Sequence, residues 1–254
     1  MALKDKFIGD MDRWLVGIWL TLAVWAVWYI NSFFLVWLAL GVVYLFAFKE
    51  ANELFQIKAD SMFFYATLLW IAAYFYPYGN DLFVLAGVIF FGAVAYNPKI
   101  PMRDFLPFVY PTAGMLFFLT LYEQYGRASL LWLVIIVAAT DIGAYFVGKS
   151  IGKRSFCKTS PNKTIEGVIG GILIATAISF YFGTGIVDVY RAAIISFAVS
   201  LASVFGDLFE SYLKRQAGVK DSGNILPGHG GMLDRVDGYL FGAIVMLMLL
   251  RGIV

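Results

Sequence analysis

Long uncharged runs of hydrophobic residues alternate with short polar connections along the whole chain. A membrane-spanning helix takes about 20 apolar residues, and nine runs approach or reach that length. They cover residues 14–30, 33–48, 61–78, 82–96, 105–122, 129–147, 167–187, 192–209 and 238–254. The pattern predicts an all-α, polytopic integral membrane protein with about nine transmembrane helices.

The division between the first two runs depends on one polar pair, Asn31-Ser32, because residues 14–48 carry no charge. Cytoplasmic loops collect Lys and Arg, so the charges test this division. With nine spans, 16 of the 19 Lys and Arg residues lie on one side of the membrane, and merging the first two runs would weaken that split to 13 against 6. We therefore expect nine spans, a retained first span and a cytoplasmic N-terminus, in a multi-pass protein of the inner (cytoplasmic) membrane.

Composition supports a membrane protein and excludes several function classes. Hydrophobic residues make up 61% of the chain and charged residues 14%, with a mean hydropathy of +0.79. A soluble domain could not cover that much apolar surface. The net charge of +2 gives no case for nucleic-acid binding. One Cys and one His argue against a disulfide and against zinc.

Two connections, 148–166 and 210–237, are long, polar and charged, whereas the others are short. Long ordered loops between closely joined spans commonly hold function. We therefore divide the chain into an N-terminal transmembrane region of about five spans, 1–128, and a C-terminal catalytic region, 129–254. Both long connections are predicted to face the cytoplasm, and the active site with them.

The first long connection combines cations with glycines, hydroxyls and a predicted helix start at Gly167. Its cations are Lys149, Lys153, Arg154, Lys158 and Lys163. Such a segment suits a polyanion such as a triphosphate, bound by charge, backbone N–H groups and the helix dipole. Positive charge that fixes topology against anionic lipids explains the composition equally well. The spacing excludes a Walker A loop.

Acidic residues lie inside or beside two of the predicted spans. Asp141 and Tyr145 share a helix face with Lys149, and an intramembrane carboxylate is a functional candidate, although a structural pairing remains open. Asp207, Glu210, Ser211 and Lys214 share a face at helical spacing. An interfacial cap explains Glu210 and Lys214 as well, so exchange of Glu210 is expected to be milder than exchange of Asp207.

The second long connection adds carboxylates and glycines. Asp234 and Asp237 would face together on a helix, and Gly228, Gly230 and Gly231 allow close backbone approach to a ligand. Oxygen ligands from Asp207, Asp221, Asp234 and Asp237 favour Mg²⁺ or a similar hard cation. His229, the only histidine, is interpreted first as a binding group and second as a base.

Residues 211–237 resemble the C-terminal signature of the bacterial CDP-diacylglycerol synthases, also called phosphatidate cytidylyltransferases. The matching positions are Ser211, Lys214, Arg215, Lys220, Asp221, Gly223, Leu226, Pro227, His229, Gly230, Gly231, Asp234, Arg235 and Asp237. Gly206-Asp207, Asp141-x-x-Ala144-Tyr145 and the run from Ser160 to Gly167 also resemble blocks of this family. The resemblance covers roughly the C-terminal half of the chain.

The resemblance implies cytidylyl transfer from CTP to phosphatidic acid, with Mg²⁺ and, in some members, a neighbouring K⁺. By motif position it assigns the metal to Asp207 and Asp234, and we add Asp221. Catalytic roles then extend to Asp237, Lys214 and Arg215. The predicted substrate-binding residues are Asp141, Tyr145, Lys149, Lys153, Arg154, Lys163, Ser211, Lys220, His229, Gly230, Gly231 and Arg235. The lipid substrate and surrounding membrane lipids are the expected partners, and a homodimer is left open.

Other functions are compatible with parts of the pattern. Asp234-x-x-Asp237-Gly238 resembles the start of the CDP-alcohol phosphatidyltransferase motif, but Phe241-Gly242 replaces the Ala-Arg which that motif requires. A CTP-dependent membrane lipid kinase stays open, and its products would distinguish it. From a different class, an ion-coupled transporter could use Asp141 and Asp207 to line its path.

Overall fold

The computed structural model describes residues 22, 24–225 and 230–253. Helices account for nearly all of the regular structure in these residues, and an isolated β-bridge joins Ser155 and Thr164. The helices are α2 (Phe33–Leu54), α3 (Asp60–Phe75), α4 (Gly79–Tyr96), η1 (Met102–Phe105), η2 (Phe108–Thr112), α5 (Ala113–Ile151), α6 (Ile165–Gly183), α7 (Val189–Gln216) and α8 (Leu233–Ile253). The predicted all-α class is confirmed.

Every predicted apolar run is mostly helical where the structure describes it, although residues 76–78 and 184–187 lie beyond the ends of α3 and α6. Most of the first run lies outside the described residues, but 24–30 are helical and the chain turns at Asn31, which has a φ of 51°. The predicted break before α2 is therefore present. Among the described residues, five helical segments are long and apolar enough to cross a membrane, and α3 is a shorter apolar helix.

Helix α5 contains two of the predicted runs, 105–122 in part and 129–147. Its 39 residues are interrupted at Gly126, whose φ of 69° and ψ of −171° are not helical. Glycine adopts a positive φ without the steric penalty that a Cβ imposes, so the chain can change direction there. Two helical stretches follow one another across this residue, as the sequence predicts.

Both long connections are shorter in the structure than in the prediction. Helix α5 continues to Ile151 and α6 begins at Ile165, while α7 continues to Gln216 and α8 begins at Leu233. The connections are thus 152–164 and 217–232, because polar helix ends extend beyond the apolar run that hydropathy detects.

Local interactions stabilise two of these helix ends, the start of α6 and the end of α7. The Thr164 side chain accepts a hydrogen bond from the Gly167 N–H at 3.1 Å, and Lys214 and Arg215 lie in the last turn of α7, where the helix dipole favours cations.

Glycines allow close approach of neighbouring helices in the C-terminal half. A Cβ on Gly171 of α6 would lie 2.6 Å from the Thr140 carbonyl oxygen of α5. A Cβ on Gly206 of α7 would lie 2.3 Å from the Asp237 carbonyl oxygen of α8. Gly167, four residues before Gly171, also contacts α5 closely, so this pair of small residues lets α6 pack against α5.

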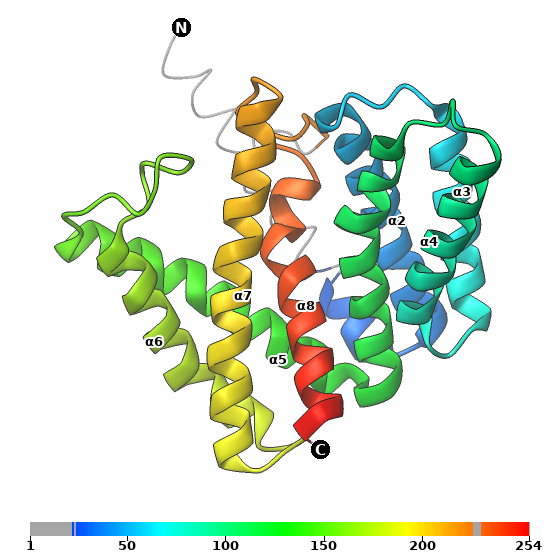
Figure 1. The fold of residues 1–254 in the computed structure, drawn as a ribbon. Helices are drawn as coiled ribbons and strands as arrows, with labels where there is room; N and C mark the ends of the chain where they lie inside the picture. The colour runs from blue at the N-terminus through cyan, green and yellow to red at the C-terminus, as the bar shows by residue number, and fades with distance from the viewer. Residues whose placement is uncertain (1–21, 23, 226–229, 254) are drawn as a thin grey trace, which may run out of the picture.

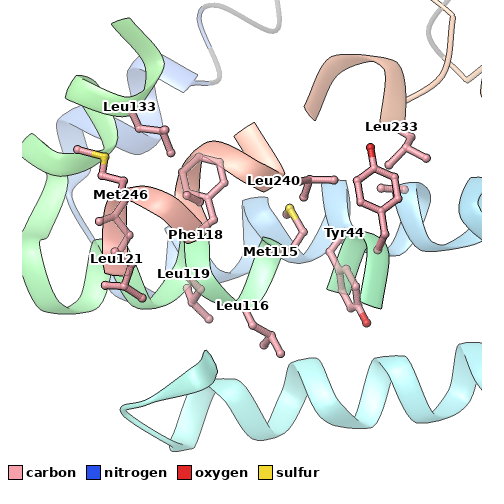
Figure 2. Close-up of a cluster of buried hydrophobic side chains, with 14 of the residues drawn as sticks. Tyr44, Met115, Leu116, Phe118, Leu119, Leu121, Leu133, Leu233, Leu240 and Met246 are labelled. Atoms are coloured by element: carbon pink, nitrogen blue, oxygen red, sulfur yellow. The ribbon is translucent and has the colours of Figure 1, made fainter. Parts of the chain in front are cut away.

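The two halves of the chain share one hydrophobic core. Figure 2 shows Tyr44 from α2, Leu116 and Leu119 from α5, and Leu240 and Met246 from α8 gathered in this core. Many large apolar side chains outside the core are exposed, which suits helices that face lipid. The N-terminal region therefore packs directly against the elements of the predicted catalytic region.

Figure 1 shows which ends of the helices lie together. The connection 152–164, the end of α7 and the start of α8 lie at one end of the molecule, whereas the turn between α6 and α7 and the end of α8 lie at the opposite end. The two charged connections are therefore on the same side of the helix bundle, as predicted.

Candidate functional site

The C-terminal part of α7 places four polar side chains on one face, as their helical spacing predicts. Ser211 donates a hydrogen bond from Oγ to Asp207 Oδ1 at 3.4 Å. Lys214 forms an ion pair with Glu210 one turn earlier, and its Nζ lies 2.5 Å from Asp234 Oδ1 of α8. This face thus joins α7 to the first turn of α8 through charge.

Glu210 is buried within the protein near the end of α7. Its side chain is 1% exposed, and its Oε1 has no hydrogen-bond partner, while its second carboxylate oxygen contacts Lys214. A buried carboxylate needs compensation for the lost hydration, which Lys214 supplies in part. The burial of Glu210 therefore gives it a role inside the cluster, and an interfacial position at the end of α7 stays open.

Lys163 connects the first charged connection to α7 through an ion pair with Asp207, in which each side chain is 28% exposed. Backbone pairing sets the position of Lys163. Phe156 N–H donates to the Lys163 carbonyl at 2.7 Å, and Ile165 N–H donates to the Arg154 carbonyl at 3.0 Å. Of the predicted phosphate-binding cations in this connection, Lys163 is the one that the structure brings to a predicted metal ligand.

The other predicted phosphate-binding cations of this connection and of the end of α5 have different neighbours. The Arg154 guanidinium forms an ion pair with Glu166 at 3.0 Å, and the backbone N–H of Lys153 donates to the same carboxylate at 3.1 Å. Lys149 Nζ lies over the ring of Tyr145, 5.6 Å from its centroid. All three cations are exposed, so they can reach a solvent-borne anion.

Asp234 is held by several donors at the start of α8. Its Oδ2 accepts hydrogen bonds from the backbone N–H groups of Ser222, at 3.0 Å, and Gly231, at 2.8 Å, while Oδ1 contacts Lys214. Gly230 has a φ of 81°, which glycine adopts readily. A Cβ there would lie 2.7 Å from Asp234 Oδ2 and 3.6 Å from Asp221 Cβ, so both acids border this glycine.

Two further acids approach the same region from α8 and α5. Asp237 Oδ1 accepts a hydrogen bond from the Gly238 N–H at 2.8 Å and lies within electrostatic range of Asp207 and Lys214. Asp141 of α5 is exposed and lies within electrostatic range of Lys163 and Asp207. This position places Asp141 near the charged cluster, and a structural pairing of its carboxylate stays open.

The remaining predicted site residues lie at the edge of this cluster. Arg215 donates from Nη1 to the Val219 carbonyl at 3.0 Å, and Lys220 and Arg235 are exposed. His229 lies outside the described residues. Within the described residues, no group of three or more acidic, histidine or cysteine side chains is arranged to hold a metal ion. Asp207, Asp221 and Asp234 thus do not form a three-carboxylate cage, and lysine ammonium groups contact Asp207 and Asp234.

Sequence reasoning missed Glu50 and Tyr110, which both belong to the N-terminal region. Tyr110 is 3% exposed, its hydroxyl has no hydrogen-bond partner, and its ring packs edge-on against Phe209 of α7 at 5.1 Å. Glu50 is 3% exposed and accepts hydrogen bonds from the start of α8. Glu50 directly follows Lys49 after an apolar run, so in the sequence it resembles an ordinary charge at the end of a span. Its position beside a span is the one signal in the sequence that could have pointed to it.

The fold and the site together define a helical membrane protein with a cluster of carboxylates and lysines at one end of its bundle, where charged connections meet two packed helices. Such a cluster suits chemistry on phosphates at a membrane surface. The chain belongs to the Cytidylyltransferase family, which it matches over residues 11–253.

Curated relatives agree with this family over nearly the whole chain. A phosphatidate cytidylyltransferase from Helicobacter pylori is 39% identical over 251 residues, which cover 98% of this chain and 94% of the relative. One from Thermotoga maritima is 35% identical over 239 residues, covering 84% and 88%. A Bacillus subtilis protein of the same name is 49% identical over 124 residues, covering 47% of this chain and 46% of the relative.

Proposed function

We propose that this protein transfers the cytidylyl group of CTP to phosphatidic acid and releases CDP-diacylglycerol and pyrophosphate. The observation that carries the proposal is the paired arrangement of Lys163 with Asp207 and Lys214 with Asp234, in a chain whose relatives are phosphatidate cytidylyltransferases. These pairs join the first charged connection, α7 and α8 at one end of the bundle. A lipid phosphate at the membrane surface and a nucleotide from solution can both reach that end.

The reaction needs charge neutralisation and alignment more than proton transfer. An anionic oxygen of the phosphatidic acid phosphate attacks the α-phosphorus of CTP, a new P–O bond forms, and the bond to the β-phosphate oxygen breaks to release pyrophosphate. The nucleophile is already ionised, so no general base is required. Repulsion between two polyanions dominates the barrier, and fixed cations that hold both phosphates lower it.

The cations divide by position. Lys149, Lys153, Arg154 and Lys163 belong to the end of α5 and the connection that follows it, and we assign them to the CTP phosphates. Lys214, Arg215, Lys220 and Arg235 belong to α7, α8 and the segment between them, and we assign them to the phosphates shared by CTP and lipid. Lys214 reaches the substrate from a partly buried position between two carboxylates.

The donor set fits Mg²⁺. This ion commonly binds through one or two carboxylates together with substrate phosphates and water, so it does not need a cage built from protein alone. Asp207 and Asp234 would hold it, with Asp221 beside Asp234, and the unpartnered Glu210 Oε1 marks a further oxygen donor in the cluster. Bound there, Mg²⁺ would neutralise triphosphate charge and polarise the phosphate under attack. A neighbouring K⁺ stays a prediction.

We further propose nine membrane spans, a cytoplasmic N-terminus and an active site that faces the cytoplasm, in the inner membrane. The distribution of Lys and Arg supports this orientation, as does the location of both charged connections at one end of the bundle.

The function is tested with purified protein in detergent, supplied with CTP, phosphatidic acid and Mg²⁺. Formation of CDP-diacylglycerol and pyrophosphate in equal amounts, followed by mass spectrometry and a phosphate assay, is the expected result. Release of CDP with a newly phosphorylated lipid would indicate a kinase instead. Folded protein that forms neither product would refute the proposal.

A further inference from the structure

Glu50 is a buried carboxylate in α2 that contacts the start of α8 from the other half of the chain. Its Oε1 accepts a hydrogen bond from the Met232 N–H at 2.9 Å, and its Oε2 accepts one from the Leu233 N–H at 2.8 Å. Ser222 Oγ donates to the same Oε2 at 2.9 Å. Three donors thus satisfy a side chain that is 3% exposed.

These donors are the groups that a helix start leaves without partners. The first N–H groups of a helix have no acceptor within the helix, and a residue just before it usually caps them. In α8, Glu50 from a position more than 180 residues earlier takes this role, and its negative charge interacts favourably with the helix dipole. The carboxylate therefore determines where α8 begins relative to α2.

The same contacts lead to Asp234 of the proposed active site. The Asp234 N–H donates to Ser222 Oγ at 3.3 Å, and Ser222 N–H donates to Asp234 Oδ2 at 3.0 Å. Ser222 therefore lies between Glu50 and both the backbone and the carboxylate of Asp234. Gly223 and Gly231 leave room for this arrangement, because a Cβ on either would lie 2.5 Å from a Glu50 carboxylate oxygen.

We propose that Glu50 is a positioning residue for cytidylyl transfer. By accepting the Met232 and Leu233 N–H groups and the Ser222 hydroxyl, it holds the start of α8 and fixes the carboxylate of Asp234. This inference rests on the proposed function, because Asp234 is one of its proposed metal ligands. The inference makes a residue of the N-terminal region responsible for the orientation of that ligand. Residues that orient a metal ligand commonly change activity or metal affinity by about 10- to 100-fold when altered.

Glu50→Gln is the sharp test, because the two backbone N–H groups contact different carboxylate oxygens. Whichever oxygen becomes the amide NH₂ then faces an N–H donor, so one of the two hydrogen bonds cannot form. Glu53→Gln is the matched control, since Glu53 is exposed on the same helix less than one turn away. It removes an equal charge without touching α8.

We expect Glu50→Gln to lower kcat by about 10- to 100-fold and to raise the Mg²⁺ concentration for half-maximal rate by about 10-fold. Loss of folded protein alone would lower the rate without moving that Mg²⁺ concentration. Ser222→Ala removes the hydroxyl that lies between Glu50 and Asp234 and leaves the two backbone contacts of Glu50. It is expected to give smaller changes in the same directions. It keeps the test decisive if Glu50→Gln does not fold. Glu53→Gln should match the unmodified protein in both quantities.

Hydrogen exchange gives a readout that does not depend on the substrate. Peptides that contain Met232 and Leu233 should exchange faster in Glu50→Gln than in Glu53→Gln. If exchange is faster in Glu50→Gln but the unmodified protein makes no CDP-diacylglycerol, the structural role of Glu50 is sustained and the proposed function is refuted. Active protein whose Mg²⁺ requirement and exchange are both unchanged by Glu50→Gln and by Ser222→Ala would overturn the inference.

Discussion

Asp207 and Asp234 each contact a lysine, although they lie on different helices and belong to different segments of the site. A carboxylate that can hold a lysine ammonium can also hold Mg²⁺ when the nucleotide supplies further oxygen ligands. At the scale of single residues, the proposed chemistry therefore depends on the negative charge of these two side chains.

Asp207→Asn and Asp234→Asn are each expected to lower kcat for CDP-diacylglycerol synthesis by at least about 100-fold, because an amide keeps the shape but loses the charge that binds the metal. Initial rates with labelled CTP measure the effect, at equal amounts of folded protein. Asp81→Asn, an exposed change in the first turn of α4, is the control. Near-normal rates in either site variant would remove that residue from the metal site.

The ion pair of Lys214 with the buried Glu210 also contributes to stability. Lys214→Met would leave Glu210 buried without its cation, and loss of one partner from a buried ion pair costs about 3 kcal/mol or more. We expect a correspondingly lower free energy of unfolding in detergent. The double variant Lys214→Met with Glu210→Gln should regain part of this loss, because one of the two carboxylate charges that Lys214 compensates is gone. Equal stability of the single and double variants would contradict the assigned pairing.

Single residues of the site were predictable to different extents. Helical spacing placed Asp207, Ser211 and Lys214 on one face, since that relation is local. The contact between Lys163 and Asp207 spans 44 positions and depends on how the connection folds back, which no local pattern contains. Glu50 and Tyr110 were missed for the same reason.

Helix packing at the site depends on Gly206, where α7 and α8 touch backbone to backbone. Gly206→Ala places a Cβ 2.3 Å from the Asp237 carbonyl oxygen, closer than real contacts allow, so the two helices must separate. Because Asp207 and Asp237 are adjacent to this contact, we expect a fall in activity of about tenfold or more together with a lower melting temperature.

Gly185→Ala is the matched control for that exchange, since a Cβ on Gly185, in the turn between α6 and α7, would have no atom within 4 Å. It should leave activity and melting temperature unchanged. Unaltered activity in Gly206→Ala would mean that the close approach of α7 and α8 is unimportant for the site.

At the level of elements, hydropathy located every α-helix that the structure describes but not the short helix η1, and not all of the helix ends. The polar turns from Glu210 to Gln216 continue α7, because the backbone hydrogen bonds of a helix do not require apolar side chains. Part of the second predicted connection is therefore helix. The helical spacing predicted for Glu210, Ser211 and Lys214 is therefore present, and it places all three on a rigid element.

The whole molecule is predicted to expose both charged connections to the cytoplasm. A cysteine introduced as Lys158→Cys in a Cys157→Ser background should react with a membrane-impermeant thiol reagent in inverted vesicles and be protected in intact cells. Gly185→Cys, at the opposite end of the bundle, should show the reverse. The same accessibility at both positions would contradict the proposed arrangement across the membrane.

The most direct test of cytidylyl transfer follows the fate of two labels on the nucleotide. Purified protein with phosphatidic acid and Mg²⁺ receives CTP labelled on the α-phosphate in one reaction and on the γ-phosphate in a parallel one. We predict that the α-label enters the lipid product and the γ-label leaves as pyrophosphate, with neither event in Asp234→Asn. Transfer of the γ-label to lipid, or no lipid labelling from CTP by folded protein, would contradict cytidylyl transfer.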